Sequence, residues 1–347
     1  MRTITALAPI RICDCGGWTD TWFARHGRVF NIAIRPGAEV RIEVFPATPS
    51  RPPVVLDVAD FGDRYAPALS PGRWDRHPLL EAAIESVGLP TDVCIDIRIS
   101  SGVPAGAATG TSAAVTVALV GALWRLNGRP IDRRAIARVA HEVETVSLGQ
   151  QSGIQDQICS ALGGVNDISM TEYPEAEVRP LAASASFLEV LERRLLVILL
   201  GGGHRSTALH LRVIERLEGL GPECPELQLM RQCAGDGVRA FEMGDLAALG
   251  AAMSANTEAQ RRLHEDLVCR DGDAVIEIAR AHGALGWKVN GAGGEGGSLT
   301  LLGADSDEAR HTMRDAIAAA LPGARQFQPV LDADGLRVFD APGSDGR

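Results

Sequence analysis

The stretch Pro104-Ala-Gly-Ala-Ala-Thr-Gly-Thr-Ser-Ala-Ala114 follows a predicted strand at 94–100 and leads directly into a predicted helix at 112–126. Its small residues allow a ligand to approach the backbone, and the first helical turn presents unpaired N–H groups and the positive end of the helix dipole. Thr111 and Ser112 add hydroxyls that suit a phosphate oxygen or a metal ion. The lysine of a Walker A loop is missing. The stretch predicts an anion site at a strand–helix junction, and a tight turn beside an alanine-rich packing face is the alternative.

Strand-like and helix-like segments continue on both sides of this stretch. Apolar runs and apolar–polar alternation predict strands at 29–34, 39–45, 195–200, 286–290 and 298–302. Helical patterns cover 132–148, with Asp132 as N-cap, then 154–162, 206–218, 226–243, 245–265, 273–283 and 306–320. The aperiodic segment 171–185 is interpreted as a domain junction. The chain therefore reads as a mixed α and β protein in two lobes.

Composition excludes several classes of protein. The chain has 347 residues, 46% of them hydrophobic, and its formal charge of −10 without a basic run argues against nucleic-acid binding. The seven cysteines are scattered and include no CxxC pair, which indicates reduced thiols rather than a zinc site. No apolar run approaches the roughly 20 residues of a membrane span, and the N-terminus lacks the apolar core of a signal peptide. A cytoplasmic protein without membrane or nucleic-acid partners is expected.

A second glycine cluster, Gly291-Ala-Gly-Gly-Glu-Gly-Gly297, matches the dinucleotide fingerprint GxGxxG. That fingerprint requires a helix after the glycines, whereas the residues 298–302 that follow are strand-like. The cluster also lies too near the C-terminus for a dinucleotide domain to follow it. A strand–loop–strand unit is the better interpretation, and the Rossmann fold is excluded.

Two further segments carry polar residues suited to chemistry. Glu144 lies on a predicted helix and Asp156 at the start of the next, and carboxylates near an anion loop can hold Mg²⁺ or accept a proton from a hydroxyl. The alternative is a pair of solvated helix-end charges. In Arg11-Ile-Cys-Asp-Cys-Gly-Gly-Trp-Thr-Asp20, glycines stand beside Asp, Thr and Trp, which suits a turn that presents carboxylates to sugar hydroxyls. A plain turn between strands is equally compatible with that pattern.

Together, these segments resemble the GHMP kinase superfamily, with three motifs in the family's order over about residues 5–330. The motifs look like Ala8–Asp20, Pro104–Ser112 and Lys288–Gly296. Within the superfamily, the GGWTDT phrase is similar to the L-fucokinase module. The segments 153–164 and 202–205 look more like D-glycero-D-manno-heptose 7-phosphate kinases. The resemblance therefore points to the sugar 1-kinases.

The resemblance implies an α+β fold with an N-terminal ribosomal-S5-like β/α lobe, expected at 1–185, and a C-terminal ferredoxin-like lobe, expected at 186–347. ATP and the sugar would meet between the lobes. The implied activity is ATP- and Mg²⁺-dependent phosphorylation of the anomeric hydroxyl of a sugar or sugar phosphate. The first candidate substrate is D-glycero-D-manno-heptose 7-phosphate, and the second is L-fucose or another free hexose. The sequence leaves the oligomeric state open, with a homodimer among the alternatives.

The resemblance also assigns roles to residues by their match to the motifs. Asp156 would act as base or orienter of the sugar hydroxyl, and Arg11 would lie near the transferring phosphate. Ser112 and Glu144 would hold Mg²⁺. The implied ATP-binding residues are Pro104, Gly106, Ala107, Ala108, Gly110, Thr111, Ser112 and Ala113. The implied sugar-binding residues are Gly17, Thr19, Asp20, Asp156, Arg205 and Gly293. Arg25, His26, Arg28 and Arg35 could serve a substrate phosphate, or they are surface charges.

Two departures from the family motifs motivate an alternative function, although an active kinase remains the leading interpretation. Ala108 replaces a glycine, which strains the backbone only if its φ is positive, and Glu295 places a carboxylate in the third glycine motif. A catalytically weakened ATP-binding or regulatory protein of the same fold would carry such changes. A kinase of a mevalonate-like or homoserine-like alcohol is a further alternative, against which the GGWTD segment argues.

Lys288 is the one lysine among the 34 basic residues, and it stands three residues before the third glycine motif. An arginine-rich codon bias accounts for the other positions. The exception at Lys288 is either a functional requirement or a strand residue that kept its codon.

Overall fold

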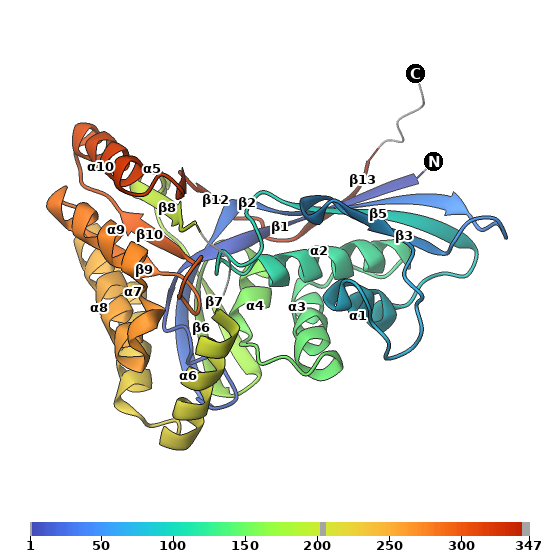
Figure 1. Ribbon diagram of the computed structural model, residues 1–347, viewed down its shortest axis with the longest axis horizontal. Coiled ribbons are helices and arrows are strands. Elements are labelled where there is room, and N and C mark those ends of the chain that lie inside the picture. Colours follow the sequence, from blue (N-terminus) through green and yellow to red (C-terminus); the bar gives the residue numbers. More distant parts are fainter. Residues whose placement is uncertain (1, 202–205, 342–347) are drawn as a thin grey trace.

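The structure is a computed structural model that describes residues 2–201 and 206–341. The larger of its two sheets contains β1 (Arg2–Cys15), β2 (Gly27–Pro46), β3 (Val54–Val58), β4 (Asp63–Tyr65), β5 (Val93–Ser101), β6 (Val165–Glu172), β7 (Glu175–Leu181), β12 (Val330–Leu331) and β13 (Arg337–Ala341). The smaller sheet contains β8 (Leu195–Leu199), β9 (Gly286–Val289), β10 (Ser298–Leu302) and β11 (Arg325–Phe327). The two sheets belong to two lobes that lie side by side (Figure 1).

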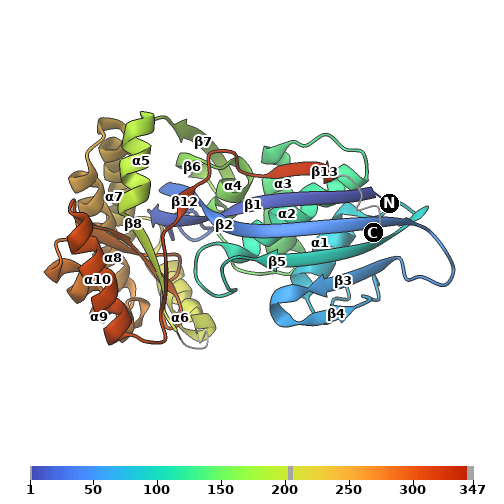
Figure 2. The ribbon, with the colours of Figure 1, turned by 90° about the horizontal axis from the view of Figure 1, so that it is seen from above.

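The first lobe also holds α1 (Pro78–Val87), α2 (Thr111–Leu126), α3 (Arg133–Glu142) and α4 (Gln155–Leu162). Helices α1, α2 and α3 lie on one face of the larger sheet (Figure 2). The second lobe holds α5 (Ala185–Arg194), α6 (Ser206–Leu220), α7 (Pro225–Met243), α8 (Leu246–Leu263), α9 (Arg270–Ala281) and α10 (Asp307–Ala320). The predicted α+β class with two lobes is confirmed.

Strand β2 forms one continuous 20-residue strand where the sequence predicts two, at 29–34 and 39–45. Between them lie Pro36 and Gly37, which usually interrupt a strand. They are tolerated because β2 changes partners there: it pairs with β6 and β12 up to Arg35 and with β5 from Ala38 onward. A proline at such a change of partner removes no ladder hydrogen bond.

Strand β1 is not predicted by the sequence, although it carries the first motif. The register of its pairing with β2 shifts between Ala8 and Ile10 and again between Ile12 and Cys15. Residues Ala8–Cys15 are all buried. Because β-bulges and burial on both faces remove the apolar–polar alternation, the usual pattern of a strand is absent here.

The helices around the second motif agree closely with the prediction. Helix α2 begins at Thr111, and the Asp132 side chain caps α3 by accepting hydrogen bonds from the N–H groups of Arg134 and Ala135, at 3.0 and 3.1 Å. The helix predicted to continue to 148 instead ends at Glu142 and is followed by a π-helical turn, Val143–Ser147. This turn carries Glu144, the carboxylate expected to bind Mg²⁺, and π-helical turns of this kind are frequent at functional sites.

The segment 171–185, interpreted as a domain junction, is mostly the β6–β7 hairpin of the first lobe, followed by the start of α5. The segment is therefore an ordered hairpin rather than an irregular connection, and along β7 exposed residues alternate with half-buried ones such as Ala176 and Val178, which pack against the core. The division at residues 185 and 186 stays a prediction, and β12 and β13 return to the first lobe to pair with β2 and β1. None of the helices in residues 2–201 and 206–341 has the length and apolar character that a membrane span requires.

Candidate active site

A cavity of about 380 Å³ lies where all three sequence motifs meet. Strand β1 and the loop after it form one part of its wall, and the loop before α2 together with the start of α4 forms another. The second lobe contributes helix α6 and the turn after β9. The predicted site residues in the wall are Arg11, Asp20, Gly106, Ala108, Gly110, Thr111, Ser112, Asp156 and Gly293.

The loop before α2 is a chain of left-handed backbone positions, with φ of 86° at Gly106, 56° at Ala108 and 72° at Gly110. Gly110 is the N-cap of α2 and offers no side chain to the first helical turn. The N–H groups of that turn therefore remain available to an anion. The backbone N–H of Arg11 donates to the Thr109 carbonyl at 3.0 Å and fixes the loop against β1.

Ala108 adopts the positive φ at which an L side chain is strained. The substitution of the usual glycine therefore carries a conformational cost. Its carbonyl accepts a hydrogen bond from Arg11 Nη1, which helps to hold the loop in this conformation. The second departure, Glu295, is exposed and does not line the cavity. Its carboxylate therefore does not face the loop before α2.

Arg11 and Asp156 form the central ion pair of the cavity. Arg11 Nε lies 2.8 Å from Asp156 Oδ1, and Nη2 lies 3.1 Å from Oδ2, so the fork of the guanidinium holds both carboxylate oxygens. Burial lowers the pKa of Arg11, but the charges of Asp156 and Asp14 outweigh that effect and raise it above its ordinary value. The guanidinium is thus a permanent cation beside the Gly110 loop. Each carboxylate oxygen keeps a lone pair for a substrate hydroxyl.

Asp20 lies in the same wall and is 3% exposed. Its Oδ2 accepts a hydrogen bond from the Gln155 backbone N–H at 3.1 Å, which joins the first motif to the start of α4. Burial raises the pKa of Asp20 to about 6, and the nearby charge of Asp156 adds to this rise. Asp20 and Asp156 therefore form a pair of neighbouring carboxyl groups with different surroundings.

Glu144 does not line the cavity but lies directly behind it. Its Oε2 accepts hydrogen bonds from Ser152 Oγ at 2.7 Å and Gln157 Nε2 at 2.9 Å. Its Oε1 is buried and has no hydrogen-bond partner among the described residues. Burial raises the pKa of Glu144 to about 7, and the charge of Asp156 contributes to the rise. A buried carboxylate oxygen without a partner fits a hard cation such as Mg²⁺.

The remaining predicted residues support the wall without lining it: Gly17, Thr19, Pro104, Ala107 and Ala113. Thr19 Oγ1 donates to the Gly16 carbonyl at 2.7 Å, so this hydroxyl stabilises the turn after β1. The Ala107 carbonyl accepts from Ser298 Oγ at 2.6 Å, which ties the second motif to β10. Arg205 lies outside the described residues.

The sequence did not single out several residues of the wall. Trp18, with a φ of 75°, stacks on His210 of α6 with ring centroids 4.9 Å apart, and Trp22 lies nearby. Trp18 stands within the first motif, but His210 has no local signal because it comes from the other lobe. Asp14 was likewise quoted only as part of the motif, although it reaches the third motif: its Oδ2 accepts from the Gly291 N–H at 2.9 Å.

The four basic residues considered for a substrate phosphate do not line the cavity. Arg28 pairs with Asp167 at 2.8 Å, and Arg35 lies 3.4 Å from Asp332. His26 and Arg25 also lie outside the wall. In the described part of the cavity, Arg11 is the one arginine or lysine.

Comparison with known proteins connects this cavity to a family. Residues 79–164, which contain the Gly110 loop and Asp156, match the family model "GHMP kinases N terminal domain". Over these residues, the chain is similar to the N-terminal domain of the GHMP kinases. It is 29% identical to a galactokinase of Streptomyces coelicolor, over 82% of this chain and 80% of that protein. It is also 29% identical to a mevalonate kinase of Pyrococcus horikoshii, over 80% of this chain and 77% of that one.

The GHMP fold is also evident in solved structures. A D-glycero-D-manno-heptose 1-phosphate kinase from Bacteriodes thetaiotaomicron superposes with a TM-score of 0.71 at 18% identity, covering 98% of this chain and all of the other. At that identity, the similarity shows a shared fold. The expected two-lobed GHMP kinase architecture is thus confirmed.

Proposed function

We propose that this protein transfers the γ-phosphoryl group of ATP to the anomeric hydroxyl of a sugar or sugar phosphate. The observation that carries the proposal is the convergence of the open N-terminus of α2, the Arg11–Asp156 pair and Asp20 in one cavity. Phosphoryl transfer depends on positioning the reactants and on stabilising charge at the phosphate oxygens, and this arrangement provides groups for both tasks.

The loop 104–113 would hold the ATP phosphates through the backbone N–H groups at the start of α2. Asp156 would accept the hydrogen bond of the attacking hydroxyl and take up its proton as the new P–O bond forms and the bond to the β-phosphate oxygen breaks. Arg11 would hold Asp156 in place and offer positive charge to the transferring group. Asp20 would orient the sugar by accepting hydrogen bonds from its other hydroxyls.

Ser112 and Glu144 are the residues that would hold Mg²⁺. Ser112 lines the cavity at the first turn of α2, and Glu144 Oε1 is the buried oxygen that no described residue satisfies. When bound, the cation would supply neutralising charge to the ATP phosphates. The Ser152 and Gln157 hydrogen bonds fix the orientation of the Glu144 carboxylate for that role.

A sugar substrate is supported by the composition of the wall. Trp18 and Trp22 lie near Asp20, and an aromatic face beside a carboxylate suits the C–H face and the hydroxyls of a pyranose. D-glycero-D-manno-heptose 7-phosphate remains the first candidate from the sequence resemblance. A free hexose such as L-fucose is the second candidate, and the difference between the two is the phosphate that only the heptose substrate carries.

ADP release measured with Mg-ATP tests the proposal. The acceptor panel contains free hexoses, heptose 7-phosphates, mevalonate and homoserine. We expect release that depends on a sugar or sugar phosphate. Release with mevalonate or homoserine alone would replace the sugar with another alcohol. Calorimetric ATP binding without turnover on any acceptor would favour the regulatory alternative that the strained Ala108 suggests.

A further inference from the structure

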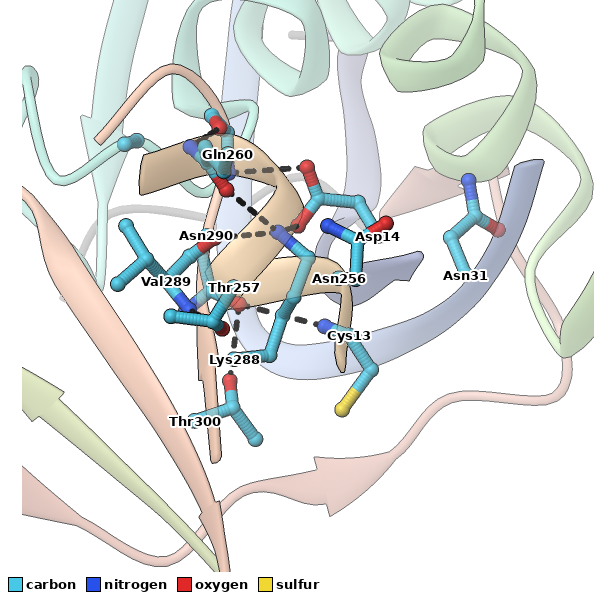
Figure 3. A network of polar contacts seen from close by, with 12 residues as sticks. Cys13, Asp14, Asn31, Asn256, Thr257, Gln260, Lys288, Val289, Asn290 and Thr300 are labelled. Carbon is cyan, nitrogen blue, oxygen red and sulfur yellow. Dashed lines mark hydrogen bonds and ion pairs between the residues drawn. The ribbon is translucent and has the colours of Figure 1, made fainter. Parts of the chain in front are cut away.

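Lys288 lies on β9 and is 1% exposed, although it is a charged residue. Its ammonium group points toward Asp14 of β1 and Gln260 of α8 (Figure 3). The three residues come from both lobes, and β9 leads directly into the turn Gly291–Gly293 of the cavity wall. The single lysine of the chain therefore lies behind the wall at the contact between the lobes.

A closed ring of contacts surrounds the Gly291 peptide. Its N–H donates to Asp14 Oδ2 at 2.9 Å, and its carbonyl accepts from Gln260 Nε2 at 2.8 Å. Lys288 Nζ completes the ring: it lies 3.3 Å from Asp14 Oδ1 as an ion pair and donates to Gln260 Oε1 at 3.2 Å. The two groups that hold Gly291 are thus both oriented by one ammonium.

The Gly291 peptide is a sensitive part of the wall. A Cβ at this position, where φ is 56°, would lie 2.7 Å from the Ala108 carbonyl oxygen and 3.0 Å from Arg11 Nη2. A small displacement of this turn would therefore reach both the phosphate loop and the Arg11–Asp156 pair. Asp14 is fully buried, so without Lys288 its carboxylate would be a buried negative charge without an ion-pair partner in the cavity wall.

We propose that Lys288 is a positioning residue for nucleotide binding: it neutralises Asp14 and, through Asp14 and Gln260, fixes the Gly291 turn against the phosphate loop. The inference rests on the proposed binding of ATP in this cavity. It assigns Lys288 no contact with the substrate and no part in proton transfer.

The geometry also explains why this one position carries lysine. Lys288 Nζ is surrounded by oxygens of three residues, namely Asp14, Gln260 and the carbonyl of Val289. A compact ammonium has three donors that can point to three separate acceptors, whereas a guanidinium is planar and larger. An arginine would keep the charge but would have to displace buried neighbours.

Isothermal titration calorimetry with Mg-ATP on the full-length protein tests the proposal in Lys288→Met, Lys288→Arg and the double variant Asp14→Asn/Lys288→Met. We expect Lys288→Met to weaken ATP binding at least tenfold and Lys288→Arg to weaken it to a lesser degree. The double variant should recover most of the affinity lost in Lys288→Met, because it leaves no buried charge unpaired. If Lys288→Met alone does not fold, the ATP affinity of the double variant is still measured against wild type, because that variant also lacks Lys288.

Ile317→Ala is the matched control, because Ile317 is fully buried in the second lobe and lies outside the cavity. It should lower the Tm while the ATP affinity of the folded protein stays within twofold of wild type. ATP affinity of folded Lys288→Met within twofold of wild type would overturn the inference, as would a double variant that binds no better than the single one. If the wild-type protein binds no ATP, the proposed function itself fails. If the wild-type protein binds ATP and Lys288→Met binds it equally well, only the inference about Lys288 fails.

Discussion

At the scale of single residues, the Asp156 carboxylate is the group nearest to the proposed chemistry. Its replacement in Asp156→Asn keeps the shape of the side chain but removes the acceptor of the hydroxyl proton. We expect kcat to fall by roughly 10³-fold, the usual range for a lost general base, while the ATP dissociation constant changes little. Steady-state turnover and calorimetry measure the two quantities separately.

Asp167→Asn is the matched control for this prediction. Asp167 is also paired with arginines, Arg28 and Arg179, and is more buried than Asp156, but it lies on β6 outside the cavity. Turnover per folded molecule should be unchanged in this variant. Retention of more than a third of wild-type turnover by Asp156→Asn would show that another group accepts the proton.

Asp20 gives the site a defined pH dependence. Burial raises its pKa from 3.8 to about 6, so the folded protein binds this proton more tightly than the unfolded chain. The contribution of Asp20 to stability is therefore fully present below pH 3.8 and is lost as the pH rises through 6, by about 3 kcal/mol at most. For function the direction is opposite, because only the ionised carboxylate accepts hydrogen bonds from two sugar hydroxyls.

We therefore expect KM for the sugar to rise as the pH falls below 6, with ATP affinity less affected. Urea unfolding at pH 4.5 and 7 should show that Asp20→Asn gains stability relative to wild type at the higher pH. A KM for the sugar that is flat between pH 5 and 7 would contradict the role of Asp20.

Residue roles could be predicted only in part from the sequence. Asp156, Arg11 and Asp20 could be singled out because they stand in motifs, and the structure brings them into one wall, while their roles stay predictions. Thr19 and Gly17 stand in the same motif, yet they support the turn instead, since motif membership does not say which way a side chain points. His210 and Gln260 could not be found, because their helices meet the site only through tertiary packing.

At the scale of elements, helix α2 links the fold to the site through the glycines at its two ends. Gly110 at its start and Gly128 after its end both have positive φ, 72° and 68°. A Cβ on Gly110 would lie 3.1 Å from Asp156 Oδ2, whereas a Cβ on Gly128 would meet no atom within 4 Å. The two positions therefore share a backbone requirement but differ in their contact with Asp156, the proposed base.

Alanine at either position should lower the free energy of unfolding by about 1 kcal/mol, the usual cost of a side chain in the left-handed region. Only Gly110→Ala should also lower turnover, by at least about tenfold, because it displaces Asp156 and the first helical turn. Urea unfolding and kcat measured on both variants check this. Equal turnover in the two variants would separate the Gly110 loop from catalysis.

Elements with a clear local pattern could be predicted, and those shaped by their neighbours could not. Strand β5 alternates strictly and Asp132 is a typical N-cap, so both were found within a residue or two. Strand β1 has bulges and is buried on both faces, and the π-turn after α3 has no periodicity of its own. Both of these unpredicted elements carry site residues or hold them in place.

At the scale of the whole molecule, the chain closes the first lobe with its last strands. Strand β13 pairs with β1, the Leu336 N–H donates to the Ala161 carbonyl at 3.1 Å, and the Leu336 side chain is 1% exposed. The sequence could not predict this return, because residues 330–341 form short strands whose partners lie at the opposite end of the chain. The two lobes are therefore not two consecutive halves of the sequence.

Truncation after residue 329 should destabilise the first lobe. Loss of Leu336 burial alone removes about 2 kcal/mol, and the pairing of β1 with β13 is lost as well. Thermal unfolding followed by circular dichroism should show a lower Tm than truncation after residue 341, which keeps β12 and β13. Equal Tm values for the two truncations would mean that the first lobe does not depend on these strands.

The central claim is that this molecule places phosphate on the anomeric oxygen of a sugar. Phosphorus NMR of the product, after incubation with Mg-ATP and the sugar that gives the fastest ADP release, tests it most directly. The account predicts a new phosphate resonance coupled to the anomeric proton, absent with Asp156→Asn. A product phosphorylated at any other position, or ADP release without a phosphorylated sugar, would contradict it.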